Sequence, residues 1–368
     1  MLRIAFVLEQ ALGHVTHSRN LYENVSPACG IEPAWAPIPW DVSGWAGKVP
    51  LYRSNWTVRA SLRARRSLTE LQREAPLDGI FFHTQVTAVL AQNWLRTIPS
   101  IVSLDATPKQ YDALGDVYAH EPGPRWLEAL KDRANQTCCE NARHLVTWSA
   151  WAKASLVHDY ELPESKITVI PPGVNSAAWA PDTPRELRGG PVRILFVGGN
   201  LERKGGTHLL EAFSRIADLD VHLDLVTRDS PRPQPRVQVH QGLQPNSPEL
   251  MDLYHAADIF CLPTMGDCLP MVLSEAGAAG LPAISTNVAA IPEIVRDGES
   301  GLLVPPGDSA ALESALRTLV ENPLLRLSMG ERAMGIVREQ YDAPTNARRL
   351  CELLKRTLRQ AAAKGAKA

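Results

Sequence analysis

The chain has 368 residues, of which 45% are hydrophobic and 21% are charged, and its formal net charge is −2. The length favours two domains over one, and the composition is ordinary for a globular protein. The small net charge gives no indication of a nucleic-acid partner, and no apolar run is long enough to cross a bilayer. The six cysteines have no metal-binding spacing and are expected to be free thiols in a reducing cytosol.

The first part of the chain alternates strand-like and helix-like segments. Short apolar runs predict strands, and amphipathic runs predict helices. The predicted strands are 2–8, 78–82, 100–104, 144–148 and 167–170, and the predicted helices are 15–24, 127–139 and 151–160. Residues 1–8 lead directly into a loop and lack the pattern of a signal peptide. This alternation predicts a doubly wound α/β domain.

All nine tryptophans lie within the first 179 residues. Residues 35–56 contain four of them and are predicted to form a long loop, followed by a helix rich in arginine. The arginines of this helix are Arg59, Arg63, Arg65 and Arg66. Such residues fit an acceptor pocket or a basic surface that contacts an anionic membrane. A core with one solvated basic face explains them equally well.

A second α/β series follows residues 174–191, whose Asn, Ser, Asp, Pro and Gly content predicts an interdomain connection. The predicted strands are 193–197, 221–226, 237–240, 259–262 and 283–285. The predicted helices are 206–216, 247–256, 270–279, 309–321, 324–339 and 344–361. Residues 361–368 are rich in Ala and Lys and are predicted to be a frayed tail.

The segment 263–282 carries the strongest functional pattern. It begins with a turn-prone stretch after a strand and continues as a helix with Pro270 near its start and Gly280 just past its end. Two acids, Asp267 and Glu275, lie eight positions apart. The N-terminus of a helix suits an anion such as a diphosphate, and carboxylates accept hydrogen bonds from sugar hydroxyls. The pattern therefore predicts a nucleotide-sugar site.

A glycine-rich turn in residues 194–206 gives a second pattern. The sequence Ile-Leu-Phe-Val-Gly-Gly-Asn-Leu-Glu-Arg-Lys-Gly-Gly predicts a strand, a turn and the start of a helix. Gly198 and Gly199 let the backbone approach a bulky ligand, and Lys204 can reach a phosphate. The order of residues is neither a Walker A loop nor Gly-x-Gly-x-x-Gly. Both patterns begin at strand ends, where open sheets bind ligands, so their cations and acids are expected to converge.

Together the two patterns resemble the retaining family 4 (group 1) glycosyltransferases, in which an acid is followed by seven residues, Glu-Ala and Gly-x-Pro. The resemblance implies an α/β protein of GT-B architecture, with two facing Rossmann-like doubly wound domains. Residues 1–174 would form the acceptor side and residues 175–343 the nucleotide-sugar domain, and a helix in 344–368 would pack back on the first domain. By this resemblance Glu275 grips the donor ribose and Asp267, where the family usually has Glu, contacts the transferred sugar.

The resemblance also assigns the cations of the donor site. Lys204 matches the family lysine that neutralises the donor diphosphate. The family arginine is replaced by Gly199, and the neighbouring Arg203 is the candidate substitute. Gly198 and Leu269 complete the donor-binding residues that we expect in the second domain.

In the first domain the candidates are Gly13, His14 and Asp105. Gly13 and His14 follow the first strand and are expected to meet the phosphate or the acceptor. Asp105 lies where many family members have a sugar-contacting histidine; it either accepts a hydrogen bond from a sugar hydroxyl in that place or caps a turn. The predicted catalytic residues are thus Lys204, Asp267, Glu275 and Asp105. No metal site is expected: the Asp-x-Asp at 218–220 lies before a strand, where acids commonly mark a loop.

These features predict a retaining, metal-independent hexosyltransferase without a cofactor, using a UDP- or GDP-type sugar in the cytoplasm for polysaccharide biosynthesis. The acceptor is a glycan, a lipid-linked molecule or a small molecule, and nucleic acid is excluded. A location at the inner face of the membrane, with peripheral contact through the first domain, stays open, and so does the oligomeric state. Two other functions also stay open: a nucleotide-sugar epimerase of the same fold, and a non-catalytic nucleotide-sugar-binding protein.

Overall fold

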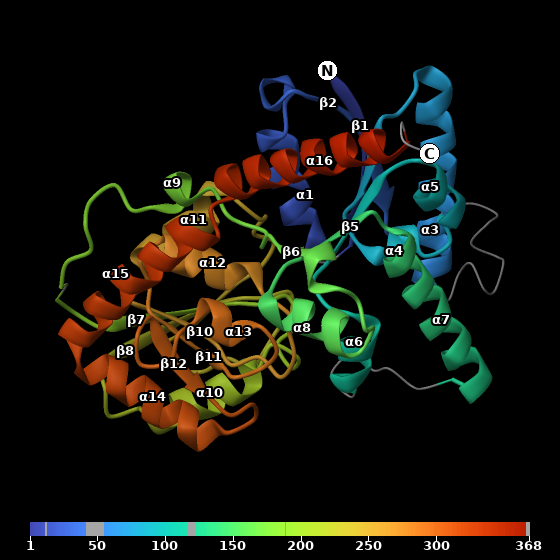
Figure 1. Ribbon diagram of the computed structural model, residues 1–368. Coiled ribbons are helices and arrows are strands. Elements are labelled where there is room, and N and C mark those ends of the chain that lie inside the picture. Colours follow the sequence, from blue (N-terminus) through green and yellow to red (C-terminus); the bar gives the residue numbers. More distant parts are fainter. Residues whose placement is uncertain (12, 42–54, 116–122, 188, 366–368) are drawn as a thin grey trace. The chain divides into compact units, whose positions relative to one another are not determined.

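The computed structural model describes residues 1–11, 13–41, 55–115, 123–187 and 189–365 (Figure 1). The chain forms two compact units. Unit 1 comprises Met1–Pro172 together with Ala343–Ala368, and unit 2 comprises Gly173–Asp342. Each unit contains a six-stranded parallel sheet with helices, so the predicted α/β class is confirmed. All six cysteines are free thiols.

The sheet of unit 1 has the strand order β2-β1-β3-β4-β5-β6. Its strands are β1 (Leu2–Gln10), β2 (Ile31–Pro39), β3 (Gly79–Phe82), β4 (Ser100–Leu104), β5 (His144–Thr147) and β6 (Ile167–Val169). The order reverses between β1 and β3. In such sheets the loops that leave the carboxyl ends of the strands at the reversal border a ligand crevice.

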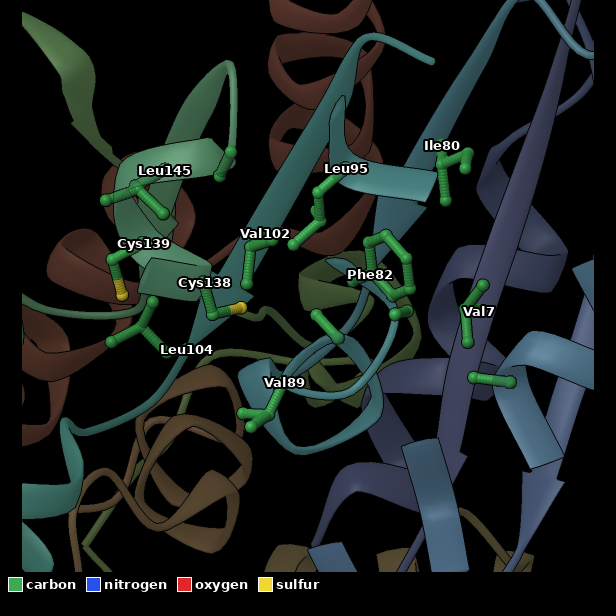
Figure 2. Packing of buried hydrophobic residues seen from close by; sticks show 14 of the residues in the cluster. Val7, Ile80, Phe82, Val89, Leu95, Val102, Leu104, Cys138, Cys139 and Leu145 are labelled. Carbon is green, nitrogen blue, oxygen red and sulfur yellow. The ribbon is translucent and has the colours of Figure 1, made fainter. Parts of the chain in front are cut away.

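Helices cover both faces of this sheet. They are α1 (His14–Asn24), α3 (Trp56–Glu74), α4 (Gln85–Ala88), α5 (Gln92–Thr97), α6 (Pro108–Ala113), α7 (Arg125–Asn141), α8 (Ala150–His158) and α16 (Ala343–Gly365). Side chains of β1 alternate between two cores, as the pleat of a strand requires. Val7 lies in the core that Figure 2 shows, with Phe82 and Cys138. Phe6 lies in the other core, which contains the apolar side of α16, including Leu354.

The sheet of unit 2 has the order β12-β11-β10-β7-β8-β9. Its strands are β7 (Val192–Val197), β8 (Val221–Val226), β9 (Val237–His240), β10 (Ile259–Leu262), β11 (Ala283–Thr286) and β12 (Gly301–Val304). Its helices are α9 (Ser176–Trp179), α10 (Gly206–Arg215), α11 (Pro248–Ala256), α12 (Met271–Ala278), α13 (Ile291–Ile294), α14 (Ser309–Glu321) and α15 (Pro323–Gln340). The order reverses between the central strands β7 and β10, which is where a doubly wound sheet binds its ligand.

The structure differs from the sequence-based predictions in four segments. The predicted loop 35–56 contains the end of strand β2, while residues 42–54 lie outside the described residues. The predicted connection 174–191 contains helix α9 and packs as part of unit 2. Strand β12 lies in a segment predicted to form turns. Helix α16 continues to Gly365, so the first residues of the predicted frayed tail are helical.

Within the described part of the chain, no helix has both the length and the apolar composition that a membrane span requires.

Candidate functional site

Two loops of unit 2 meet at the reversal point of its sheet. One joins β7 to α10 and the other joins β10 to α12. Gly205 in the first loop has φ +73°, and a Cβ there would lie 1.8 Å from the carbonyl oxygen of Pro263 in the second. The backbone N–H of Met265 also donates to the carbonyl of Arg203 at 2.9 Å. Only glycine permits this close approach, and it brings the charged side chains of both loops together.

Three of the predicted donor-site residues form one ion cluster there. Lys204 Nζ lies 2.7 Å from both carboxyl oxygens of Asp267. Arg203 Nη1 lies 3.1 Å from Asp267 Oδ1, and the hydroxyl of Thr264 donates to Oδ2 at 2.8 Å. Burial alone would raise the pKa of Asp267, but Lys204 and Arg203 outweigh this and hold it below its ordinary value. Two cations and one carboxylate leave the cluster with one net positive charge.

The glycines of the first loop differ in their steric role. A Cβ at Gly198 would lie 3.0 Å from Cβ of Lys204, so this glycine lets the lysine pack over the turn. A Cβ at Gly199 would make only an ordinary contact with Arg228, at 3.6 Å. Leu269 in the second loop is buried, and no described side chain caps the N-terminus of the α12 helix that follows.

Glu275, the second predicted acid, is not part of this ion cluster. It lies in α12, is 4% exposed, and accepts a hydrogen bond at 2.8 Å from the hydroxyl of Tyr254 in α11. Burial raises the pKa of Glu275 to about 7, and the hydrogen bond from Tyr254 opposes this rise. Sequence reasoning missed Tyr254, because nothing in the sequence of α11 marks its tyrosine as the partner of a distant acid.

The candidates of unit 1 lie at the carboxyl edge of its sheet. His14 Nε2 is 3.9 Å from Asp105 Oδ2, which also accepts a hydrogen bond from the Tyr111 hydroxyl at 2.5 Å. The other oxygen of Asp105 accepts from the backbone N–H of Ala106 at 2.9 Å. Gly13 has φ −65° and open space around its Cβ position, so neither conformation nor packing demands a glycine there.

His14 also belongs to a cluster of three histidines around a tryptophan. Sequence reasoning missed this cluster. His14, His17 and His83 surround Trp148, with ring centroids 5.1–5.9 Å from that of the tryptophan. Burial lowers the pKa of His17 to about 3, and it lowers that of His83 well below its ordinary value. The imidazoles of His17 and His83 are therefore neutral. Spacing along the chain gave no signal, because the three histidines and the tryptophan come from three different segments.

The first acid of the Asp-x-Asp segment forms an ion pair with an arginine of a later helix. Asp218 pairs with Arg317 of α14 at 2.8 Å. Among the residues that the structure describes, no group of three or more His, Cys, Asp or Glu side chains is arranged to hold a metal ion.

Two family models match the chain, and together they cover most of it. "Glycosyltransferase Family 4" matches residues 25–178, and "Glycosyl transferases group 1" matches residues 191–322. The chain therefore belongs to the family 4, group 1 glycosyltransferases.

Curated relatives agree with this assignment. D-inositol 3-phosphate glycosyltransferase of Corynebacterium efficiens is 29% identical over 225 residues, which cover 54% of this chain and 53% of that enzyme. Glycogen synthase of Mycobacterium tuberculosis is 28% identical over 255 residues, or 64% of this chain and 60% of that enzyme. The chain thus spans about half of the length of the curated relatives it matches.

Solved structures show the same fold over nearly the whole chain. Sucrose-phosphate synthase from Thermosynechococcus elongatus superposes with a TM-score of 0.78 at 18% identity, covering 98% of this chain and 100% of that one. Anabaena HepE, solved in complex with UDP and glucose, has a TM-score of 0.68 at 15% identity, covering 96% and 100%. The predicted GT-B fold is thereby confirmed.

Proposed function

We propose that this protein is a retaining glycosyltransferase that moves a sugar from a nucleoside-diphosphate sugar to an acceptor hydroxyl without a metal ion or cofactor. The observation that carries the proposal is the Arg203–Lys204–Asp267 cluster at the reversal point of the unit 2 sheet. A doubly wound sheet binds its ligand at this point. The matched family and the UDP held by HepE, a protein of the same fold, support it further.

The chemically difficult step of this reaction is the departure of the nucleoside diphosphate. Negative charge grows on its oxygens as the bond to the sugar breaks, so preorganised positive groups accelerate the step. Lys204 and Arg203 supply two cations, and the uncapped N-terminus of α12 adds N–H groups and the positive end of a helix dipole. The net positive charge of the cluster suits an anionic diphosphate.

The acids would recognise hydroxyls of the donor. Lys204 and Thr264 hold the carboxylate of Asp267 in a fixed orientation. Its oxygens could then accept a hydrogen bond from a sugar hydroxyl. Glu275 would accept from the ribose. In unit 1, His14 and Asp105 offer polar groups for an acceptor hydroxyl or phosphate. We propose a glycan, lipid-linked or small-molecule acceptor and a UDP- or GDP-type donor; contact of unit 1 with a membrane stays a prediction.

A binding screen tests the donor site. Thermal unfolding would be followed with UDP, GDP, ADP and their common sugars, without metal, for the wild type, Glu275→Gln and the exposed control Glu249→Gln. A ligand that binds only the folded state raises the unfolding temperature. We expect one nucleotide to stabilise the wild type and the control, and to stabilise Glu275→Gln less. If no nucleotide or nucleotide sugar stabilises the wild type, the proposal is wrong.

The bound nucleotide sugar, incubated alone, then distinguishes the remaining functions. An epimerase converts it without an acceptor, and a non-catalytic binding protein leaves it unchanged with every acceptor. A glycosyltransferase instead transfers the sugar once an acceptor is added, with the anomeric configuration retained in the product.

A further inference from the structure

Tyr254 fixes one carboxyl oxygen of Glu275 from a neighbouring helix. Its hydroxyl donates to Oε2 of Glu275 at 2.8 Å. The phenol ring is fully buried; it stacks on Phe260 with centroids 5.5 Å apart and meets Trp179 edge-on at 5.0 Å. These aromatic contacts hold the ring in place. A tyrosine whose only polar atom faces a buried acid is a directed hydrogen-bond donor.

The backbone that carries this pair is also fixed. Arg185 donates from Nε to the carbonyl of Ala279, just after α12, at 2.7 Å. It donates from Nη2 to the carbonyl of Tyr254 near the end of α11, also at 2.7 Å. Such contacts satisfy carbonyls that a helix end leaves without a partner in the helix. One arginine therefore ties the ends of the two helices together and sets the spacing of Tyr254 and Glu275.

The other surroundings of Glu275 in the described structure are apolar or paired elsewhere. Helix α15 presents Val337 and the backbone of Ala333 to Gly277 of α12. His255 of α11 faces the carbonyl of Trp179 at 3.0 Å. Asp267, which precedes α12, pairs with Lys204 and Arg203 in the ion cluster. Apart from burial, the one influence on the pKa of Glu275 in this part of the chain is Tyr254.

We propose that Tyr254 is a positioning residue: its hydrogen bond holds the Glu275 carboxylate as an oriented acceptor for the two ribose hydroxyls of the donor. This inference rests on the proposed function. A carboxylate offers about four acceptor positions, whereas a protonated carboxyl turns one of its oxygens into a donor. With one position occupied by Tyr254, the remaining positions are left for the vicinal diol of a ribose.

The proposal predicts a pH dependence of donor binding. A donor that needs the carboxylate binds fully above the pKa of Glu275 and loses affinity as the pH falls below it. Tyr254 stabilises the carboxylate and lowers this pKa, so Tyr254→Phe should raise it. The loss of affinity should then begin at a higher pH. Since a hydrogen bond to a charged group changes an equilibrium by about tenfold or more, we expect about tenfold weaker binding near neutral pH.

Calorimetry with UDP-glucose, whose diphosphate does not titrate near neutral pH, provides the test, with GDP-mannose and ADP-glucose in parallel. Affinity is measured from about pH 6 to about pH 8.5 for the wild type, Tyr254→Phe, Glu275→Gln and the double variant. We expect Tyr254→Phe to approach the wild type at the alkaline end and Glu275→Gln to show no such dependence. In the Glu275→Gln background the tyrosine change should cost nothing further.

Different outcomes separate the two proposals. If the wild type binds none of the three nucleotide sugars, the proposed function fails and this inference fails with it. If the wild type binds but Tyr254→Phe has the same pH profile, or weakens binding equally in the Glu275→Gln background, the role of Tyr254 alone is wrong. Should Tyr254→Phe not fold, the wild type and Glu275→Gln still decide: a wild-type affinity that does not fall toward acid pH overturns the inference.

Discussion

At the scale of single residues, Lys204 contacts one anion, the carboxylate of Asp267, and under the proposed function it would contact a second, the donor diphosphate. Both oxygens of Asp267 lie within hydrogen-bond distance of the ammonium group of Lys204, whose side chain is 15% exposed. A bound diphosphate would add its own oxygens to this coordination. Lys204 therefore stabilises the buried carboxylate of Asp267, and under the proposed function it would also stabilise an anionic leaving group.

Removal of this lysine should weaken both stability and binding. Lys204→Ala leaves Asp267 buried with Arg203 as its remaining cationic partner, and we expect a loss of about 1–3 kcal/mol in the free energy of unfolding. Nucleotide affinity should fall by roughly 10- to 100-fold. Urea unfolding and calorimetry with UDP would measure the two effects. Arg66→Ala, which changes an exposed cation, is the control, and equal behaviour of the two variants would contradict the assignment.

The candidate site was only partly predictable at this scale. The Asp-x7-Glu spacing and the Arg203–Lys204 pair placed charged residues after two strands of one sheet, and the structure brings three of them together. The sequence did not predict that Glu275 bonds Tyr254, nor that His83 packs among histidines. Both contacts join segments far apart in the chain, where no local period or turn residue marks the partner.

At the scale of elements, the loops after β7 and β10 depend on one backbone contact. Gly205→Ala would place a Cβ 1.8 Å from the carbonyl oxygen of Pro263 and would keep a φ of +73° that side chains disfavour. We expect a loss of about 3 kcal/mol or more in stability and loss of nucleotide binding, because the two loops must separate.

The chain offers a matched control for this change. Gly242 has φ +77° but nothing within 4 Å of its Cβ position. Gly242→Ala should therefore cost only the conformational part, about 1–2 kcal/mol, and leave UDP affinity unchanged. Urea unfolding and calorimetry of the two variants separate the cost of the positive φ, which both share, from the cost of the contact with Pro263, which only Gly205→Ala makes. Equal costs for both would show that the contact with Pro263 does not hold the loops together.

The elements themselves were predictable where pattern and environment agree. Strands β4, β9 and β10 have the bounds predicted for them. Strand β2 was missed because it contains Pro33, Pro37 and Pro39, which argue against a central strand. However, β2 is an edge strand, and its three prolines are all at odd-numbered positions. Backbone N–H groups at alternate positions point to the same side of a strand, so these prolines can all lie on the side away from β1, where no hydrogen bond to the sheet is lost. The prediction failed because a sequence does not say which strand lies at the edge.

At the scale of the whole molecule, one unit is built from two separate segments of the chain. In the sequence, unit 2 lies between the two segments that form unit 1. The last helix, α16, returns to unit 1 and lies beside α1 (Figure 1). Its Leu358 contacts β3 so closely that a Cβ at Gly79 would lie 2.7 Å from Cδ2. Unit 1 is therefore incomplete without residues that follow unit 2.

A substitution in α16 should consequently affect the start of the chain. Leu354 is 1% exposed within the core that contains Phe6 and Leu21. Leu354→Ala leaves a cavity, and we expect unit 1 to lose about 2–4 kcal/mol of stability. Hydrogen exchange should speed up in β1, α1 and β3 while β7 and β10 keep their protection. Leu324→Ala, at a residue that is 74% exposed, is the control. Equal acceleration in both units would mean that they unfold as one.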